Sequence, residues 1–478
     1  MQLYISGKWQ NTEESMPVYN PFDGSVVDEV SIAGPDEVEK AIVSAQRGAL
    51  VMEEMPYWHR SEIIAKVSQL LAERKEEIAK IITLENGKTI KEARGEIGRS
   101  VMTLTSAAEE AKRMHGETLP LSALNIPNIE KKFGFTFRVP CGVVLAITPF
   151  NVPVNLACHK LGSAIAGGNS VIFKPASDTP LSGLMLAQVF LDAGLPEEAI
   201  QCLTGPGEKI GAMLSPDKRI RKITFTGSYQ AGQKICQMAG LKKVTMELGG
   251  NCPVIVMPDA DPEKVASALV PAGYGLTGQA CVSVQRAFIH EKLYEEIIEG
   301  LNKKLDEFVL GDPMDEKTTM GPLIRESDAI RVEKTIALAS QSGAHIIRGG
   351  QRERNFIHPA IVADVTPEMT IYSDELFGPA IGFIKFNTFE EAVAGANDTN
   401  YGLSAGVFTE NINLAMQFIR QIKSGNIMIN WPSRWRVDHM PSGGIKDSGI
   451  GKEGPRYAIE ELTELRTAIL HLDQRSPF

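Results

Sequence analysis

Short runs of apolar residues, each followed by a segment with helical periodicity, occupy the middle of the chain. They cover residues 143–148, 170–174, 200–204, 222–226 and 244–248, at intervals of about 20 to 30 residues. This spacing is typical of strand–helix–strand units, in which neighbouring strands run parallel. The pattern therefore predicts a parallel α/β sheet that ends near residue 248.

A second series of short apolar runs follows residue 250. Helical patterns over 292–308 and 389–396 separate its members. We therefore expect a second α/β sheet after the first. Its predicted strands are 254–257, 287–290, 346–348, 381–386, 405–409 and 426–430.

Other periodicities predict the parts outside the two sheets. The first 25 residues suggest short strands and turns, and apolar spacing predicts helices from about residue 36, over 58–83 and over about 88–114. Residues 120–140 and 463–478 alternate apolar and polar side chains, which predicts strands. One subunit would leave their apolar faces exposed, so we expect a homodimer or homotetramer in which the 120–140 segment pairs across subunits.

The composition excludes several classes of protein. The chain has 478 residues, enough for two or three domains, and its apolar (43%) and charged (23%) fractions are those of a globular protein. Its net charge of −10 argues against nucleic acid or an anionic membrane as a partner. The start lacks a signal-peptide pattern. Prolines interrupt the longest uncharged run, 139–158, so we expect it to be a buried core segment and not a membrane span. No two of the six cysteines have CxxC spacing, so we expect no metal site. Six cysteines in so long a chain do not form a disulfide scaffold, so we expect the thiols to be reduced and the protein to be cytoplasmic.

Cys281 is the cysteine with the most distinctive surroundings. Gly273, Gly275 and Gly278 precede it, and backbone without side chains lets an electrophile approach the sulfur. A nucleophilic thiol needs such access. The alternative is a small buried hydrophobic residue, the usual role of a free cysteine.

Three polar residues stand at or just after the ends of predicted strands, where open α/β sheets bind ligands. Glu247 is a candidate general base or a salt-bridged carboxylate, and Asn151 a candidate oxyanion donor or a helix N-cap. Lys174 points into a site or is an ordinary strand-end lysine. Glycine-rich turns at 205–211 and 227–232 can bring backbone N–H groups to a phosphate, although neither fits a dinucleotide or P-loop fingerprint.

Seven short motifs occur in order along nearly the whole chain. They are TPFN (148–151), FKPA (173–176), FTGS (225–228), MELGG (246–250), GQAC (278–281), ELFGP (375–379) and GGIKDSGIGKEG (443–454). In order and spacing they resemble the aldehyde dehydrogenase superfamily. The resemblance implies an aldehyde dehydrogenase-like α/β fold with three parts. These are a Rossmann-type cofactor domain (1–119 and 141–248), an α/β catalytic domain (249–447) and a β-arm for oligomerisation (120–140 and 463–478).

The resemblance also implies roles for single residues. Cys281 matches the nucleophile, Glu247 the base that activates the hydrolytic water, and Asn151 the oxyanion-hole amide. The implied reaction is NAD(P)-dependent oxidation of an aldehyde to the acid through a thiohemiacetal and a thioester. Lys174 and Glu375 match residues that hold the nicotinamide-side and adenine-side riboses. The other residues that match cofactor contacts are Thr148, Pro149, Phe150, Ala176, Ser177, Gly207, Phe225, Gly227, Ser228, Leu248 and Phe377.

Three positions depart from the family pattern. Ser177 stands where NAD-preferring members often carry Glu, and without that carboxylate a 2′-phosphate is not repelled, so we expect both NAD and NADP to be used. Phe150 stands where the family often has Trp, and Ser442 where an aromatic residue is common, which alters the substrate tunnel.

The substrate is predicted from charged residues near the family's substrate entrance. Arg434 and Arg436 lie in the segment 431–439, and His159 lies on the helix that follows Asn151. They suggest a small anionic or hydroxylated aldehyde bearing phosphate, phosphonate, sulfonate or carboxylate, with lactaldehyde as a neutral alternative. A CoA-acylating semialdehyde dehydrogenase is a further alternative, but it would lack the base at Glu247. A non-catalytic structural protein would not need Cys281.

Overall fold

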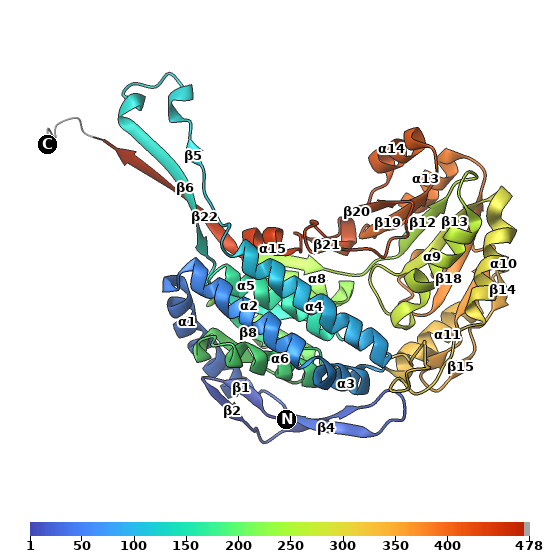
Figure 1. The fold of residues 1–478 in the computed structure, drawn as a ribbon, viewed down its shortest axis with the longest axis horizontal. Coiled ribbons are helices and arrows are strands. Elements are labelled where there is room, and N and C mark those ends of the chain that lie inside the picture. Colours follow the sequence, from blue (N-terminus) through green and yellow to red (C-terminus); the bar gives the residue numbers. More distant parts are fainter. Residues whose placement is uncertain (473–478) are drawn as a thin grey trace.

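The computed structural model describes residues 1–472 and consists of two α/β units and an arm that projects from the first (Figure 1). The predicted strand segment 473–478 lies outside the described residues. No helix in this part of the chain combines the length and the apolar character needed to span a bilayer.

The first unit is built on an eight-stranded sheet with the order β2-β1-β9-β8-β7-β10-β11-β21. Its five central strands run parallel, as the spacing of the apolar runs predicts. Ile147 pairs with Lys174 and Phe225, and Thr226 pairs with Glu247, so these strands end at one edge of the sheet. The strands are β1 (Leu3–Ile5), β2 (Lys8–Gln10), β7 (Val143–Ile147), β8 (Ser170–Lys174), β9 (Ile200–Cys202), β10 (Ile220–Thr226), β11 (Lys243–Glu247) and β21 (Gly449–Ile450).

Helices cover the first sheet, and one helical prediction is wrong. The segment 58–83 forms two helices, because the backbone leaves helical geometry at Arg74 (φ −95°, ψ 15°). Arg74 pairs with Asp192 at 2.6 Å, and Glu76 and Glu77 favour a new helix start just after it. The helices of this unit are α1 (Pro35–Glu54), α2 (Tyr57–Glu73), α3 (Lys75–Asn86), α4 (Ile90–Glu110), α5 (Pro153–Ala166), α6 (Pro180–Asp192), α7 (Gly207–Leu214), α8 (Tyr229–Ala239) and α15 (Pro455–Glu461).

The second unit contains a seven-stranded sheet with the order β14-β17-β18-β13-β12-β19-β20. The predicted strands are present, and a four-residue strand that the sequence analysis missed, β17, lies between β14 and β18. The strands are β12 (Cys252–Val256), β13 (Val284–His290), β14 (His345–Arg348), β17 (Ala360–Ala363), β18 (Ala380–Phe386), β19 (Ser404–Phe408) and β20 (Asn426–Ile429). The helices are α9 (Pro262–Tyr274), α10 (Tyr294–Leu305), α11 (Glu326–Gln341), α12 (Thr370–Ser373), α13 (Phe389–Asn397) and α14 (Ile412–Gln421).

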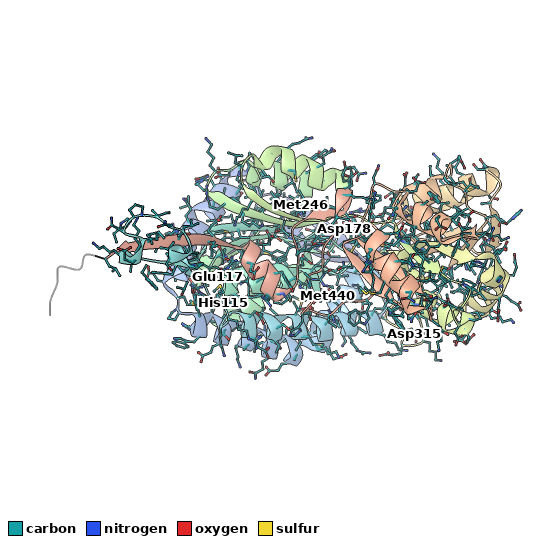
Figure 2. All side chains as sticks on the ribbon, turned by 90° about the horizontal axis from the view of Figure 1, so that it is seen from above. His115, Glu117, Asp178, Met246, Asp315 and Met440 are labelled. Atoms are coloured by element: carbon teal, nitrogen blue, oxygen red, sulfur yellow. The ribbon has the colours of Figure 1, made fainter. Side chains whose placement is uncertain are left out.

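The arm is a three-stranded antiparallel sheet in the order β22-β6-β5. Strand β6 (Lys132–Pro140) pairs with β22 (Thr463–His471) and with β5 (Thr118–Leu119). The prediction of a strand from residue 120 is wrong, because 121–123 and 129–131 form single 3₁₀ turns. His115 and Glu117 lie at the base of the arm in the view from above (Figure 2). Two hairpins complete the fold: β3 (Ser15–Tyr19) with β4 (Val26–Ser31), and β15 (Arg352–Glu353) with β16 (Phe356–Ile357).

Candidate active site

A cavity of about 940 Å³ lies where the parallel strands of the first sheet end, against α11 and the segment 370–377 of the second unit. Its lining residue Asp178 lies toward the middle of the molecule in the view from above (Figure 2). Asn151 and Cys281 also line the cavity. So does every residue assigned to the cofactor: Thr148, Pro149, Phe150, Lys174, Ala176, Ser177, Gly207, Phe225, Gly227, Ser228, Leu248, Glu375 and Phe377.

The wall of this cavity suits a ligand with a pyrophosphate. Ser228 caps α8, its Oγ accepting the Ala231 N–H at 3.3 Å, and the start of this eleven-residue helix borders the cavity. Helix starts favour anions because their first N–H groups have no partners within the helix. The hydroxyls of Thr148 and Thr226 are buried at the wall without a hydrogen-bond partner in residues 1–472, which leaves them available to a ligand. The residues present therefore fit a dinucleotide.

The two ends of the cavity differ in chemistry. At one end, Lys174 Nζ donates to Ser177 Oγ at 3.3 Å, and burial lowers the pKa of Lys174 to about 8. At the other, Glu375 accepts the Gly250 N–H at 3.0 Å, and burial raises the pKa of Glu375 to about 7. The Glu375 carboxylate is close enough to raise the pKa of the Cys281 thiol, so the Glu375 end is the one nearer the thiol.

An ion pair that the sequence analysis missed crosses the side of the cavity. Arg325, just before α11, donates from both Nε and Nη2 to the carboxylate of Asp178, which follows Ser177. Its guanidinium also lies over the Phe150 ring, 5.6 Å from the ring centre. The pair thus joins the second unit to the loop after β8 and neutralises Asp178 next to Ser177.

The loop that carries Cys281 has strained backbone. Leu276 and Thr277 have left-handed φ values of 55° and 56°, which side chains other than glycine adopt at a cost. The Leu276 N–H donates to Glu92 at 2.7 Å and the Thr277 hydroxyl donates to the Gly321 carbonyl at 3.0 Å. These contacts hold the loop in a conformation that leaves Cys281 partly exposed at the cavity.

The surroundings of Cys281 disfavour the thiolate form of its side chain. Burial raises its pKa, and the nearby Cys252, Glu375 and Glu247 raise it further, while Arg436 lowers it. Only the thiolate is an effective nucleophile. The thiol proton must therefore leave before or as the sulfur attacks.

Asn151 lies against the backbone that leads to Cys281. Its Nδ2 donates to the Gln279 carbonyl at 2.8 Å, and its side chain is buried. The alternative role of Asn151 as a helix N-cap does not hold, because Val152 precedes the first helical residue of α5 and no side chain caps it. The amide is instead directed toward the Cys281 loop, where it can donate to an oxygen on a carbon attached to the sulfur.

Glu247 ends β11 and has an unpartnered carboxylate oxygen. Oε1 is buried and has no hydrogen-bond partner among residues 1–472, and a Cβ on Gly443 would lie 2.7 Å from it. Burial raises the pKa of Glu247 well above its usual value, and the Glu453 carboxylate raises it further. A raised pKa makes a carboxylate a stronger base, so Glu247 can remove a proton from a water.

The predicted substrate residues lie in different electrostatic settings. Arg436 donates to Glu453 at 3.2 Å and lies 3.4 Å from His159 Nδ1. His159 is buried and lies 3.5 Å from Asp438, and burial together with Arg436 lowers its pKa far enough to keep the ring neutral. His159 therefore supplies no positive charge. Arg434 donates to the Pro271 carbonyl at 2.6 Å and has no carboxylate within 4.0 Å in the described chain.

The model of the aldehyde dehydrogenase family matches residues 9–468 of the chain. The chain belongs to this family. It is an NAD(P)-dependent aldehyde dehydrogenase, and the α/β fold described above is that of the family.

Individual members of the family resemble the chain over nearly its whole length. 3-Sulfolactaldehyde dehydrogenase from Priestia megaterium is 46% identical over 470 residues, which cover 98% of each chain. Lactaldehyde dehydrogenase from Methanococcus maripaludis is 36% identical over 473 residues, 98% of this chain and 100% of that one. The crystal structure of glyceraldehyde-3-phosphate dehydrogenase GapN from Methanocaldococcus jannaschii complexed with NADP has a TM-score of 0.92 at 36% identity, covering 97% of this chain and 100% of that one.

This aldehyde dehydrogenase has a second set of buried charges that the sequence analysis missed. Glu453 accepts hydrogen bonds from Lys160 at 2.8 Å and from Arg436 at 3.2 Å. Although burial raises the pKa of Glu453, these cations together lower it, so this carboxylate stays ionised beside Glu247. The sequence signal for this set was the adjacent titratable residues His159 and Lys160 inside the apolar sequence of α5.

Proposed function

We propose that the enzyme oxidises a small anionic 2-hydroxyaldehyde, of the 3-sulfolactaldehyde kind, to the corresponding acid through a thioester on Cys281. The 46% identity to 3-sulfolactaldehyde dehydrogenase over 98% of both chains supports this substrate class. The observation that carries the proposal is Arg434, a guanidinium near Cys281 with no carboxylate partner in the described chain.

The side chains around Cys281 suit each step of this reaction. The Cys281 thiol loses its proton to solvent as its sulfur adds to the aldehyde carbon, and the Asn151 amide stabilises the oxygen as it becomes negative. Lys174, Ser177 and Glu375 would hold NAD(P), which would supply the acceptor for the hydride lost from that carbon as the thioester forms. Glu247 then removes a proton from a water, which attacks the thioester and releases the acid and the thiol.

We propose that the two riboses bind in the opposite order to the one expected from the sequence. The nicotinamide must approach the carbon held on Cys281, and Glu375 is the residue beside that thiol. We therefore place Glu375 at the nicotinamide-side ribose, with Lys174 and Ser177 at the adenine side. The motif order alone could not show this, because it says nothing about which strand end lies beside the nucleophile.

Arg434 is placed to bind the anionic head group of the substrate. Its guanidinium crosses Gly275, a position where a Cβ would overlap it, six residues before Cys281. Burial lowers the pKa of Arg434, while Glu92 and Cys281 raise it, which indicates a partly desolvated cation close to the nucleophile. A sulfonate would supply the missing counter-charge, and an unpaired, desolvated cation binds an anion more strongly than a surface cation does.

Replacement of Arg434 by Gln tests this substrate class. We expect kcat/KM for 3-sulfolactaldehyde to fall by about 10²-fold, because hydrogen bonds between charged groups contribute about 1.5–3 kcal/mol. The value for lactaldehyde, which lacks the sulfonate, should change by less than about threefold. Steady-state kinetics with both aldehydes measures the difference.

The Arg436→Gln variant is the matched control. Arg436 already has a carboxylate partner in Glu453, so its loss should affect both aldehydes to the same degree. Equal losses for the two aldehydes in the Arg434 variant would rule out the head-group role of Arg434.

We propose that the enzyme uses both NADP and NAD. Ser177 Oγ donates to the Gly205 carbonyl at 3.0 Å and lies beside Lys174, so a 2′-phosphate near it would meet a hydroxyl and a cation. Arg325 neutralises Asp178, the nearest carboxylate in sequence. The homologous GapN structure was determined in complex with NADP.

Replacement of Ser177 by Glu should convert the enzyme to strong NAD preference. The new carboxylate would repel the 2′-phosphate at short range, so kcat/KM for NADP should fall about 10- to 100-fold while the value for NAD changes little. Initial rates with each cofactor give the ratio. An unchanged NADP-to-NAD ratio, or a parent enzyme unable to use NADP, would show that another residue controls the preference.

We also propose that the enzyme is a homodimer or homotetramer in the cytoplasm. The arm exposes apolar side chains that a monomer would leave in water: Phe133, Phe137, Leu465, Ile469 and Leu470. None of the six cysteines, all within the described residues, forms a disulfide, which fits a reducing compartment. Sedimentation should show a dimer or tetramer at micromolar concentration, and Leu465→Glu should shift it toward monomer. A parent enzyme that sediments only as a 52.1 kDa species would refute the assembly.

A further inference from the structure

The turn between α3 and α4 holds the backbone that carries Asn151. Asn86 donates from Nδ2 to the Phe150 carbonyl at 2.7 Å, and Lys88 donates from Nζ to the Asn151 carbonyl at 2.7 Å. Gly87 between them has a φ of 83°, a left-handed conformation that points both neighbouring side chains to the same loop. Two successive carbonyls of the TPFN motif are therefore fixed from one turn.

Lys88 also forms an ion pair that has almost no access to water. Its Nζ lies 2.5 Å from Glu96 Oε2, and the two side chains are 2% and 3% exposed. In such surroundings each charge depends on its partner, because an unpaired buried charge is strongly disfavoured. The pair therefore defines a single position for the ammonium group and, through it, for the Asn151 carbonyl.

The second carboxylate oxygen of Glu96 holds the other side of Asn151. Glu96 Oε1 accepts the N–H groups of Val154 at 2.7 Å and Asn155 at 3.1 Å, in the first turn of α5. Asn151 thus lies between a carbonyl fixed by Lys88 and a helix start fixed by Glu96. Within residues 1–472, neither Lys88 nor Glu96 forms a hydrogen bond or an ion pair with Cys281.

We propose that Lys88 and Glu96 are positioning residues for the reaction, which act by aiming the Asn151 amide at the oxygen bound to the Cys281-attached carbon. The proposal rests on the proposed role of Asn151. An oxyanion donor works only within a few tenths of an ångström of its place, and a displacement of about 1 Å can cost about 10²-fold in rate. A buried pair that fixes the backbone on both sides of Asn151 meets that requirement.

The test measures acylation of Cys281 by 4-nitrophenyl acetate, which needs no cofactor. The thiolate attacks the ester carbonyl, the C–O bond breaks, and 4-nitrophenolate leaves and is followed by absorbance. Four variants are compared with the parent: Asn151→Ala, Glu96→Gln, the double variant Lys88→Met with Glu96→Gln, and the triple variant that adds Asn151→Ala. The double variant removes both charges, so it leaves no unpaired buried charge that would prevent folding.

We expect Asn151→Ala to acylate about 10²- to 10³-fold more slowly than the parent, the effect of losing one oxyanion donor. The double variant should be at least tenfold slower, and the triple variant no slower than Asn151→Ala, since the pair acts through that amide. The NADP dissociation constant, measured by fluorescence titration, should stay within about twofold of the parent. A folded double variant that acylates at the parent rate, or a triple variant whose losses multiply, would overturn the proposal.

Glu85→Gln is the matched structural control. Glu85 is also a buried carboxylate that accepts two N–H groups at a helix start, those of Leu181 and Ser182 in α6, and it does not contact Asn151. Its variant should lose thermal stability without slower acylation. If acylation also slows tenfold in the Glu85→Gln variant, the slower acylation of the Lys88–Glu96 double variant reflects general destabilisation, and the positioning role is overturned. A different result would show that the proposed role of Asn151 itself is wrong: the Asn151→Ala variant would then acylate at the parent rate.

Discussion

Replacing Cys281 with Ala abolishes aldehyde oxidation, with kcat at least about 10⁴-fold below the parent, because no other group can form the thioester. The variant should still fold and bind NAD(P), since Cys281 only borders the cavity and its loop is held by the contacts of Leu276 and Thr277. Reduced-cofactor absorbance gives the rate, and fluorescence titration gives the cofactor affinity.

Cys252→Ala is the control for this substitution. The Cys252 thiol donates to the Cys281 carbonyl at 3.3 Å, so it is the other thiol near the reaction, yet it faces the backbone of Cys281. We expect its variant to keep activity within about fivefold of the parent. Full activity in the Cys281→Ala variant would remove the covalent mechanism.

Replacing Glu247 with Gln should separate the two halves of the reaction. One equivalent of reduced cofactor should form in a burst, after which turnover stalls about 10²- to 10⁴-fold below the parent because no base activates the water. Stopped-flow absorbance measures the burst and the steady state. Undiminished steady-state turnover would show that another group, such as Glu453, activates the water.

The pH dependence of the same step provides an independent check on Glu247. Its pKa is raised by burial and by Glu453, and a base is active only when deprotonated. The rate of thioester hydrolysis in the parent should therefore rise with pH through this raised pKa, well above the usual range of a glutamate. The Gln variant should lack that rise. A parent rate that shows no rise with pH above the usual range of a glutamate would argue against Glu247 as the base.

Much of the fold follows from the apolar periodicity. Strands β8 and β7 are buried along their full length, and such strands appear in a sequence as uninterrupted apolar runs bounded by turns. Residues at the ends of these runs, such as Lys174 and Glu247, meet because parallel strands in register end at one edge. The motifs at strand ends accordingly predicted which residues gather around the cavity.

Other features depend on contacts between residues far apart in sequence. Arg325 meets Asp178 across 147 residues, and Lys88 meets the Asn151 carbonyl across 63, so no local pattern marks either contact. The difference between Arg434 and Arg436 also appears only in the fold, because it depends on which guanidinium has Glu453 beside it. The break at Arg74 was hidden because the apolar stripe continues on both sides of it.

The mass of the Glu247→Gln enzyme after a single turnover tests the covalent account most directly. The variant is mixed with NAD and 3-sulfolactaldehyde, quenched in acid and analysed by intact and peptide mass spectrometry. We predict a protein heavier by one sulfolactoyl group, with the adduct on the peptide that contains Cys281. Reduced cofactor formed with no adduct, or an adduct on a different residue, would contradict the account.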